Sequence, residues 1–151
     1  MAMTMSGEYE LPVPRETVWE KLNDAETLKA CIPGSEQLDK LSDTELQAVV
    51  TTKIGPVKAK FKGKVTLSDL DPPNGYKISG QGDGGVAGFA KGGATVKLTP
   101  KNGGTLLAYT VEAQIGGKLA QLGQRLVNGA AKKLADEVFK NFATAVSQQG
   151  S

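Results

Sequence analysis

The stretch VKAKFKGKVTL, residues 57–67, decides the fold of this chain. Its odd-numbered positions are apolar or small, and its even-numbered positions are lysine or threonine. Because successive side chains of a β-strand point to opposite faces, this alternation predicts a strand with one buried and one solvated face. Such strands are typical of antiparallel sheets that cover a core on one side only. The same period of two recurs over residues 36–113, between turn sequences such as Gly55-Pro56 and residues 71–75, and predicts a meander of about six strands.

A first strand and a pair of short helices are expected before this meander. Residues 8–11 alternate polar and apolar side chains and predict the first strand. Helical spacing of apolar residues follows at Val18, Trp19 and Leu22. Asp24 suits the N-cap of a second short helix, and Pro33-Gly34 ends that region.

A long amphipathic helix is predicted after Gly116-Gly117, because apolar residues then recur every three or four positions over about seven turns. They are Leu119, Leu122, Leu126, Ala130, Leu134, Val138, Phe142 and Val146. No other predicted helix is long enough to cover this stripe, so we expect it to lie across the buried face of the sheet. The predicted fold class is therefore α+β: a curved antiparallel sheet of about six to seven strands grips a long C-terminal helix, with two short helices after the first strand. This is the helix-grip order of START-like domains, and we expect one such domain over residues 1–151, with its core at about 3–146.

The composition excludes several kinds of chemistry. The 151 residues contain no histidine and a single cysteine, Cys31. Triads that need histidine, imidazole metal sites, iron–sulfur ligation and disulfides within the chain are therefore excluded, and we expect neither a metal nor a covalent cofactor. A nucleic-acid partner is not expected either, because aromatic residues make up 5% of the chain and the net charge is only +2. No apolar run approaches the ~20 residues of a transmembrane helix, and the N-terminus does not have the pattern of a secretory signal.

The charges are unevenly distributed along the chain. Residues 1–52 hold 4 basic and 10 acidic side chains, a net charge of −6, whereas residues 53–151 hold 14 and 6, a net charge of +8. Four lysines share one face of the strand at 57–67, namely Lys58, Lys60, Lys62 and Lys64. They are interpreted either as a solvated outer face or as an electrostatic footprint for anionic lipid or an acidic protein partner. Near an anionic membrane each such charge contributes ~1 kcal/mol.

Glycine and other small residues leave the interior open to two interpretations. Seven of the 19 glycines fall between Gly80 and Gly93, and we expect a bent strand or loop there, with a mobile lid as the alternative. The spacing Gly80-x-Gly82-x-x-Gly85 matches a dinucleotide fingerprint in letters only, because no helix is expected after it. Small residues also occupy predicted inward positions, so either backbones approach closely or space remains for a ligand. In the second case we expect the pocket to be lined by Phe61, Phe89, Leu98, Tyr109, Leu119, Leu122 and Leu126.

Four stretches in order resemble one known family. They are VWEKLND at 18–24, CIPG at 31–34, KIGPVKAKF at 53–61 and GGKLAQLGQRL at 116–126. Together they resemble the CoxG family of carbon monoxide dehydrogenase subunits, and the resemblance covers about residues 5–146. The family is START-like, in agreement with the fold expected from the pattern.

The resemblance implies an accessory role. CoxG-like proteins accompany molybdenum hydroxylases of the carbon monoxide dehydrogenase type and are thought to link them to the inner face of the cytoplasmic membrane. We therefore expect a cytoplasmic, peripherally membrane-associated, non-catalytic protein that binds a lipophilic small molecule, hypothetically a respiratory quinone. The alternative is an adaptor or maturation module with a filled core and no ligand, and an enzyme of the polyketide-cyclase kind is a third hypothesis.

Overall fold

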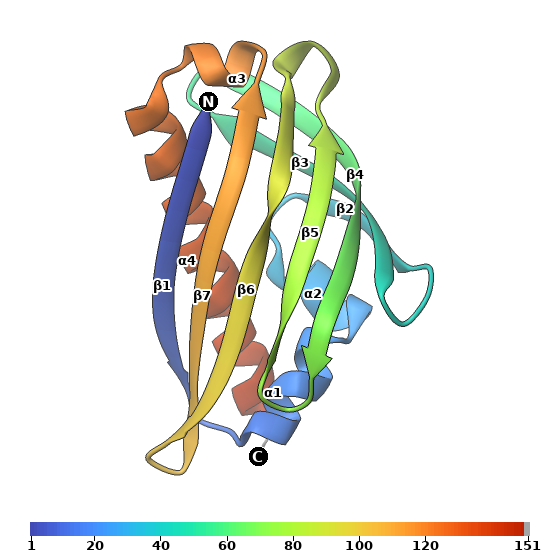
Figure 1. Cartoon of the computed structure of the whole chain (residues 1–151), viewed down its shortest axis with the longest axis vertical. Helices are drawn as coiled ribbons and strands as arrows, with labels where there is room; N and C mark the ends of the chain where they lie inside the picture. The colour runs from blue at the N-terminus through green and yellow to red at the C-terminus, as the bar shows by residue number, and fades with distance from the viewer. Residues whose placement is uncertain (150–151) are drawn as a thin grey trace.

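The computed structural model describes residues 1–149, and its elements follow the predicted order (Figure 1). The first half comprises β1 (Ala2–Leu11), α1 (Arg15–Leu22), α2 (Ala25–Cys31), β2 (Ser35–Lys40), β3 (Glu45–Ile54) and β4 (Val57–Asp71). The second half comprises β5 (Gly75–Asp83), the 3-10 turn η1 (Gly85–Ala87), β6 (Phe89–Lys101), β7 (Gly104–Gly116), α3 (Lys118–Gln121) and α4 (Gln124–Gln149).

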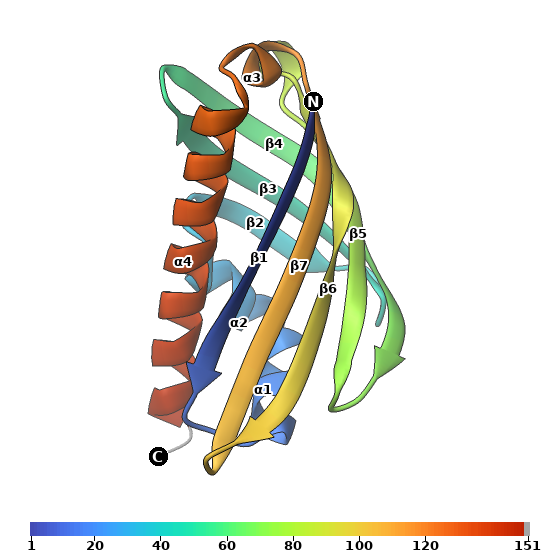
Figure 2. The same cartoon turned by 60° about the vertical axis from the view of Figure 1, so that its left-hand side comes forward.

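The seven strands form one antiparallel sheet in the order β1-β7-β6-β5-β4-β3-β2. The sheet is strongly curved, and α4 runs along one of its faces, with α1 and α2 at one end and α3 at the other (Figure 2). β1 and β2 are the edge strands, and α4 packs beside β1 and against α2. The predicted α+β helix-grip fold is confirmed, including the two short helices after the first strand.

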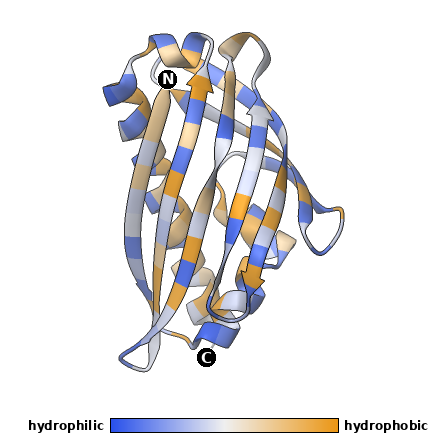
Figure 3. Ribbon diagram, viewed as in Figure 1, coloured by the Kyte–Doolittle hydropathy of each residue, from blue (hydrophilic) through white to orange (hydrophobic). Residues whose placement is uncertain are grey.

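The alternation that predicted the meander is visible along the strands as changing hydropathy (Figure 3). In β4 the lysines lie on the exposed outer face, whereas Ala59 and Leu67 are buried on the inner face. β1 continues the same pattern back to Ala2, six residues before the predicted start, with Met3 buried. No helix of residues 1–149 is both long enough and apolar enough to span a bilayer.

The short helices are fixed by local contacts. As predicted, Asp24 caps α2: its carboxylate accepts from the Glu26 amide at 3.2 Å and from the Thr27 hydroxyl at 2.7 Å. At the other end of α2 the Asn141 side chain donates from Nδ2 to the Cys31 carbonyl at 2.9 Å, which ties α2 to α4.

The core consists of two clusters at opposite ends of α4. The base cluster, beside α1 and α2, contains the buried residues Leu11, Val13, Val18, Leu22, Cys31, Leu46, Leu67, Tyr76, Val96, Leu98, Leu107, Tyr109, Phe142 and Val146. The upper cluster, beside α3, contains Met3, Ile115, Leu119 and Val127. Val111 packs against both clusters. The part of the inner sheet face that lies between the two clusters is therefore where the interior is either filled by packing or left open.

The C-terminal helix differs from the prediction of one uninterrupted stripe. Gly123 adopts φ +92°, a left-handed conformation that glycine takes without strain, and it ends the short α3 before α4 begins. The break shifts the helical phase. Val127 is buried instead of Leu126, and Leu126 is 42% exposed. The predicted place of Leu126 in the buried stripe is therefore wrong.

Candidate functional site

A floor of small residues crosses the inner face of the sheet between the two clusters. Register places Gly63 opposite Gly82, and Gly82 opposite Ala90. In the adjacent row Gly80 lies opposite Gly92, and Gly92 opposite Ala113. We call these six residues the small-residue floor: Gly63, Gly80, Gly82, Ala90, Gly92 and Ala113.

Close approach of neighbouring strands explains two of these glycines. A Cβ on Gly63 would lie 2.1 Å from the Gln81 carbonyl oxygen, and a Cβ on Gly92 would lie 2.1 Å from the Glu112 carbonyl oxygen. No side chain fits at such distances, so glycine allows the strands to bend around the helix. At Gly82 an added Cβ would make ordinary contact with the Phe61 ring at 3.5 Å. The interpretation of backbone approach therefore holds at Gly63 and Gly92, and no residue of the floor carries a side chain larger than a methyl group.

A groove of about 380 Å³ opens between β1 and α4, at the edge of the sheet. We call it the β1–α4 groove; it is lined by Met3, Thr4, Met5, Ser6, Asn128, Gly129 and Lys132. Met3 and Met5 face inward from the edge strand, and each lies in register with the inner row of β7, opposite Ala113 and Val111. A Cβ on Gly129 would have no atom within 4 Å, so the helix leaves open space at that position. The groove thus has an apolar wall of methionines and a polar wall on α4.

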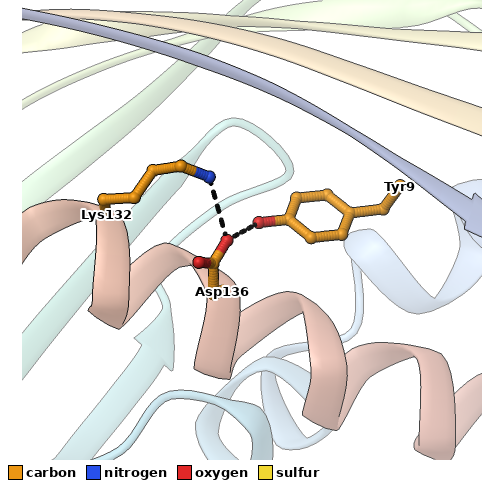
Figure 4. Close-up of polar contacts among 3 residues, drawn as sticks. All are labelled: Tyr9, Lys132 and Asp136. Atoms are coloured by element: carbon orange, nitrogen blue, oxygen red, sulfur yellow. Dashed lines mark hydrogen bonds and ion pairs between the residues drawn. The ribbon is translucent and has the colours of Figure 1, made fainter.

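A hydrogen-bonded network closes the lower end of the polar wall (Figure 4). The Tyr9 hydroxyl donates to Asp136 Oδ1, and the Lys132 ammonium lies 3.2 Å from the same oxygen. Burial, reinforced by the bond to Asp136, raises the pKa of Tyr9, whereas the Tyr9 hydroxyl and then Lys132 lower the pKa of Asp136. At neutral pH Tyr9 therefore stays protonated and Asp136 ionised, which keeps the hydrogen bond between them in place.

Two buried polar atoms in this region lack a hydrogen-bond partner among the described residues, Asn128 Oδ1 and the Tyr109 hydroxyl. Asn128 lines the groove. Tyr109 is 4% exposed and lies opposite Gly7 on β1, where a Cβ would come within 2.9 Å of the Tyr109 oxygen. Buried polar groups are nearly always hydrogen-bonded, so these two atoms are exceptions in this region.

The seven residues predicted to line a pocket do not form one continuous surface. Leu98 and Tyr109 belong to the base cluster, whereas Phe61, Leu119 and Leu122 belong to or pack against the upper cluster. The assignment of Phe89 to the interior is wrong: its neighbour Ala90 packs inward, and Phe89 points to the outer face, 42% exposed. That the other residues contact a ligand stays a prediction.

Sequence reasoning missed the groove residues Met3, Met5, Asn128 and Lys132. A signal for the methionines was present, because Met1, Met3 and Met5 continue the alternation of the first strand. Asn128 and Lys132 had no such signal, since the broken helix sets which side of α4 meets β1.

The lysines of β4 lie together on the outer face of the sheet. Lys58, Lys60, Lys62 and Lys64 are all exposed, and Lys53 of β3 lies directly opposite Lys58. One of them, Lys60, approaches a carboxylate, at 3.7 Å from Glu36, and both side chains are about half exposed. Like charges in cross-strand contact oppose folding. That this surface binds an anionic partner stays a prediction.

Residues 1–149 contain no group of three histidine, cysteine, aspartate or glutamate side chains placed to hold a metal ion. Cys31 is 2% exposed within the base cluster, and burial raises the pKa of its thiol. It packs as a small apolar side chain in this structure.

Comparison with known families gives one match that spans nearly the whole chain. The matching family model is that of CoxG, described as a subunit of carbon monoxide dehydrogenase, and it covers residues 7–147. A comparison with curated protein sequences finds no significant match.

Solved structures confirm the START-like architecture. A conserved protein from Geobacillus kaustophilus is 34% identical over 97% of this chain and 96% of its own, with a TM-score of 0.90. A protein from Thermus thermophilus is 17% identical over 99% of this chain and 100% of its own, with a TM-score of 0.75. The Zhui aromatase/cyclase from a Streptomyces species is 9% identical over 100% of this chain and 97% of its own, also with a TM-score of 0.75. At 17% and 9% identity, the last two likenesses concern the fold alone.

Proposed function

Because this chain belongs to the CoxG family of carbon monoxide dehydrogenase subunits, we propose that it is a non-catalytic accessory protein that binds a lipophilic molecule in the β1–α4 groove. The observation that carries the proposal is a groove of about 380 Å³ with methionines on one wall and an unpartnered amide oxygen on the other. Small-molecule sites combine an apolar lining with a few polar groups that fix orientation, at volumes of ~300–1,000 Å³.

The apolar part of the ligand would lie against Met3 and Met5 on the β1 wall of the groove. Methionine side chains are flexible and polarizable, so they adapt to a ring or an isoprenoid chain. Gly129 supports this placement, because it withholds a side chain from the groove where the chain of a lipophile would enter.

The polar part of the ligand would lie at Asn128. Its side chain offers the unpartnered Oδ1 to a ligand hydroxyl and its amide hydrogens to a ligand carbonyl. Lys132 lines the same groove and provides a second donor, held in place by Asp136 at 3.2 Å. A quinone has carbonyl oxygens when oxidised and hydroxyls when reduced, so this pair suits both of its redox states.

Family membership supports a molybdenum hydroxylase of the carbon monoxide dehydrogenase type as partner. In this proposal the enzyme supplies electrons, the bound quinone accepts them, and the protein carries the quinone between the enzyme and the cytoplasmic membrane. The lysine face of β4 is then the surface for an acidic partner.

The experiment that tests the proposal is native mass spectrometry of the purified protein, followed by solvent extraction and by titration with decylubiquinone. We expect one bound quinone per chain. Met5→Lys places a charge in the apolar wall and should abolish uptake, whereas Lys140→Met, which changes an exposed side chain of α4 away from the groove, should leave it unchanged.

An adaptor with a filled interior is the second candidate. It is favoured by the close strand contacts at Gly63 and Gly92, which use some of the small residues for packing. A protein that carries no lipophile after purification, and takes up none on titration, would refute the carrier and favour this second function.

A further inference from the structure

Two of the sequence motifs meet at one place on the outer face of the sheet. The stretch CIPG at 31–34 leads from α2 into β2, and KIGPVKAKF at 53–61 spans the turn from β3 into β4. Neither stretch lines the β1–α4 groove. An open hollow of about 680 Å³ lies where they meet, and we call it the outer hollow. The residues that line it are Gly34, Ser35, Glu36, Thr51, Lys58 and Lys60.

Gly34 holds the start of β2 against β3. The Thr51 amide donates to the Gly34 carbonyl at 2.9 Å. Gly34 has φ +79°, and a Cβ at this position would overlap the Thr51 carbonyl oxygen. Glycine alone takes such a conformation at so close an approach. The glycine of the CIPG stretch therefore fixes the wall of the outer hollow beside Thr51.

A β-bulge directs an acidic side chain into the outer hollow. The register between β2 and β3 shifts between Ser35 and Gln37, so Glu36 is the extra residue of the bulge. Bulges often redirect a side chain in this way. Glu36 Oε2 accepts a hydrogen bond from the Thr51 hydroxyl at 2.6 Å and lies 3.7 Å from the Lys60 ammonium. Two donors on neighbouring strands thus converge on one carboxylate oxygen.

The surroundings of this oxygen favour negative charge. The hydrogen bond from Thr51 lowers the pKa of Glu36, and the charges of Lys60 and Lys58 lower it further. A third lysine, Lys53, lies directly opposite Lys58 on β3. Among the residues that line the outer hollow, Glu36 provides the one negative charge. A single carboxylate therefore faces more positive charge than it can neutralise.

A hydroxyl of the outer hollow has hydrogen-bonding capacity that the chain does not use. Ser35 lines the hollow, and its Oγ is buried without a hydrogen-bond partner among residues 1–149. Buried polar atoms nearly always have such a partner. Ser35 thus adds an unsatisfied polar group to a lining that is already rich in donors.

We propose that the outer hollow binds a phosphate monoester, with Lys58, Lys60 and Thr51 as the donors. A phosphate monoester carries about −1.5 to −2 charges at pH 7 and has three strong acceptor oxygens. It therefore matches the three donors and neutralises more of the lysine charge than a carboxylate does. Glu36 engages two of these donors in the free protein. Because an ion pair between half-exposed side chains is weak, an incoming dianion displaces it.

This inference goes beyond the carrier function, because the outer hollow and the β1–α4 groove share no residue. It also divides the lysine face of β4 into two parts. Lys58 and Lys60 line the hollow, whereas Lys62 and Lys64 do not. A diffuse attraction for anions would involve all four lysines, but a defined site depends on the first two.

The test is titration of the ¹⁵N-labelled full chain with glycerol 3-phosphate at constant ionic strength, followed by amide shifts in NMR spectra. We expect saturable shifts at residues 34–36, at Thr51 and at residues 58–60. Succinate is the comparison ligand, because it carries a similar charge on two separated carboxylates. It should bind at least tenfold more weakly.

Variants locate the site. Lys58→Gln and Lys60→Gln should each weaken binding of glycerol 3-phosphate at least fivefold. Their matched controls, Lys62→Gln and Lys64→Gln, remove the same charge from the same face of β4 outside the hollow and should change Kd less than twofold. Glu36→Gln should bind about threefold more tightly, because it removes the carboxylate that competes for the donors.

The proposal is overturned if glycerol 3-phosphate causes no saturable shift at these residues, or if succinate binds as tightly. Equal weakening by all four lysine variants would also overturn it, since the attraction would then be diffuse. Weaker binding by Glu36→Gln would show that this carboxylate does not compete with the ligand and would overturn the proposed exchange.

A free phosphate ester and a phosphorylated side chain carry the same group, so a phosphoserine pentapeptide is titrated as well. Both outcomes support the site: equal affinity assigns it to small phosphate esters, and at least tenfold tighter binding of the peptide assigns it to a phosphorylated protein. Uptake of decylubiquinone without phosphate binding overturns only the outer hollow. Phosphate binding without uptake overturns only the carrier.

Discussion

Gly129→Leu is the substitution that tests the β1–α4 groove most directly. Gly129 is an exposed residue in the interior of α4. A Cβ at this position would have no atom within 4 Å, so a leucine side chain meets no steric barrier. Because Gly129 lines the groove, that side chain extends into it. Glycine in a helix interior is ~0.8–1.0 kcal/mol less favourable than alanine, and leucine is almost as favourable as alanine. The variant should therefore gain somewhat less than ~1 kcal/mol of stability, or up to ~2–4 °C in Tm for a chain of this size.

The same leucine should weaken ligand binding. If it displaces ~60 Å² of apolar contact between ligand and groove, the loss is ~1.5 kcal/mol, or roughly tenfold in Kd. The assay is titration with decylubiquinone by native mass spectrometry, alongside thermal unfolding by circular dichroism. Gly129→Ala is the matched control, because it brings the same gain in helix propensity but only one methyl group. A more stable Gly129→Leu variant that binds quinone as tightly as Gly129→Ala would refute the groove as the binding site.

Three further predictions concern the scaffold. Gly92→Ala places a Cβ 2.1 Å from the Glu112 carbonyl oxygen and should lower the free energy of unfolding in urea by about 2–4 kcal/mol, whereas Gly82→Ala, whose Cβ contacts Phe61 at 3.5 Å, should change it by less than about 1 kcal/mol. Burial raises the pKa of Tyr76 to about 12 and also raises the pKa of Tyr9, so both side chains stay protonated in the folded state at pH 11. Their contribution to the stability of the folded state is fully present below pH ~10, the pKa of tyrosine in the unfolded chain, and is lost as the pH rises through the folded-state pKa values. Absorbance at 295 nm should accordingly show that Tyr9 and Tyr76 ionise only as the protein unfolds in alkali, and ionisation of either of them in folded protein at pH 11 would contradict this. The Cys31 thiol, 2% exposed and with its pKa raised by burial, should react with a disulfide reagent only at the rate of unfolding, and rapid modification of folded protein would contradict its place in the base cluster.

The sheet and its order of elements could be predicted from the sequence because they depend on local patterns. The lysines of residues 57–67 mark one face of a strand wherever it packs, and Asp24 can cap a helix with atoms only two or three residues away. Family resemblance rested on motifs of similar length, and the match over residues 7–147 confirms it.

The phase of the C-terminal helix could not be predicted in the same way. Leu119, Leu122 and Leu126 fit a single helical stripe, but Gly123 takes a left-handed φ that interrupts it. Glycine within a helical pattern permits such a break but does not require it. In the structure the break accompanies the burial of Leu119 in the upper cluster, a contact that the local sequence pattern does not contain. Phe89 was misplaced because a bent strand or loop was expected between Gly80 and Gly93, whereas β6 is continuous and the phase of Val96 and Leu98, carried back along it, puts Phe89 on the outer face.

The groove was beyond prediction because its two walls come from opposite ends of the chain. Met5 and Asn128 are adjacent only because β1 pairs with β7 at the edge of the sheet and α4 then returns along that edge. An unpaired edge strand exposes backbone donors and acceptors to other chains unless something covers it. α4 covers β1 along most of its length, through the Tyr9–Asp136 contact and a bond from Gln124 Nε2 to the Ala2 carbonyl at 3.2 Å. Between these two contacts a Cβ on Gly129 would have no atom within 4 Å, so the same arrangement that protects the edge also leaves the β1–α4 groove open.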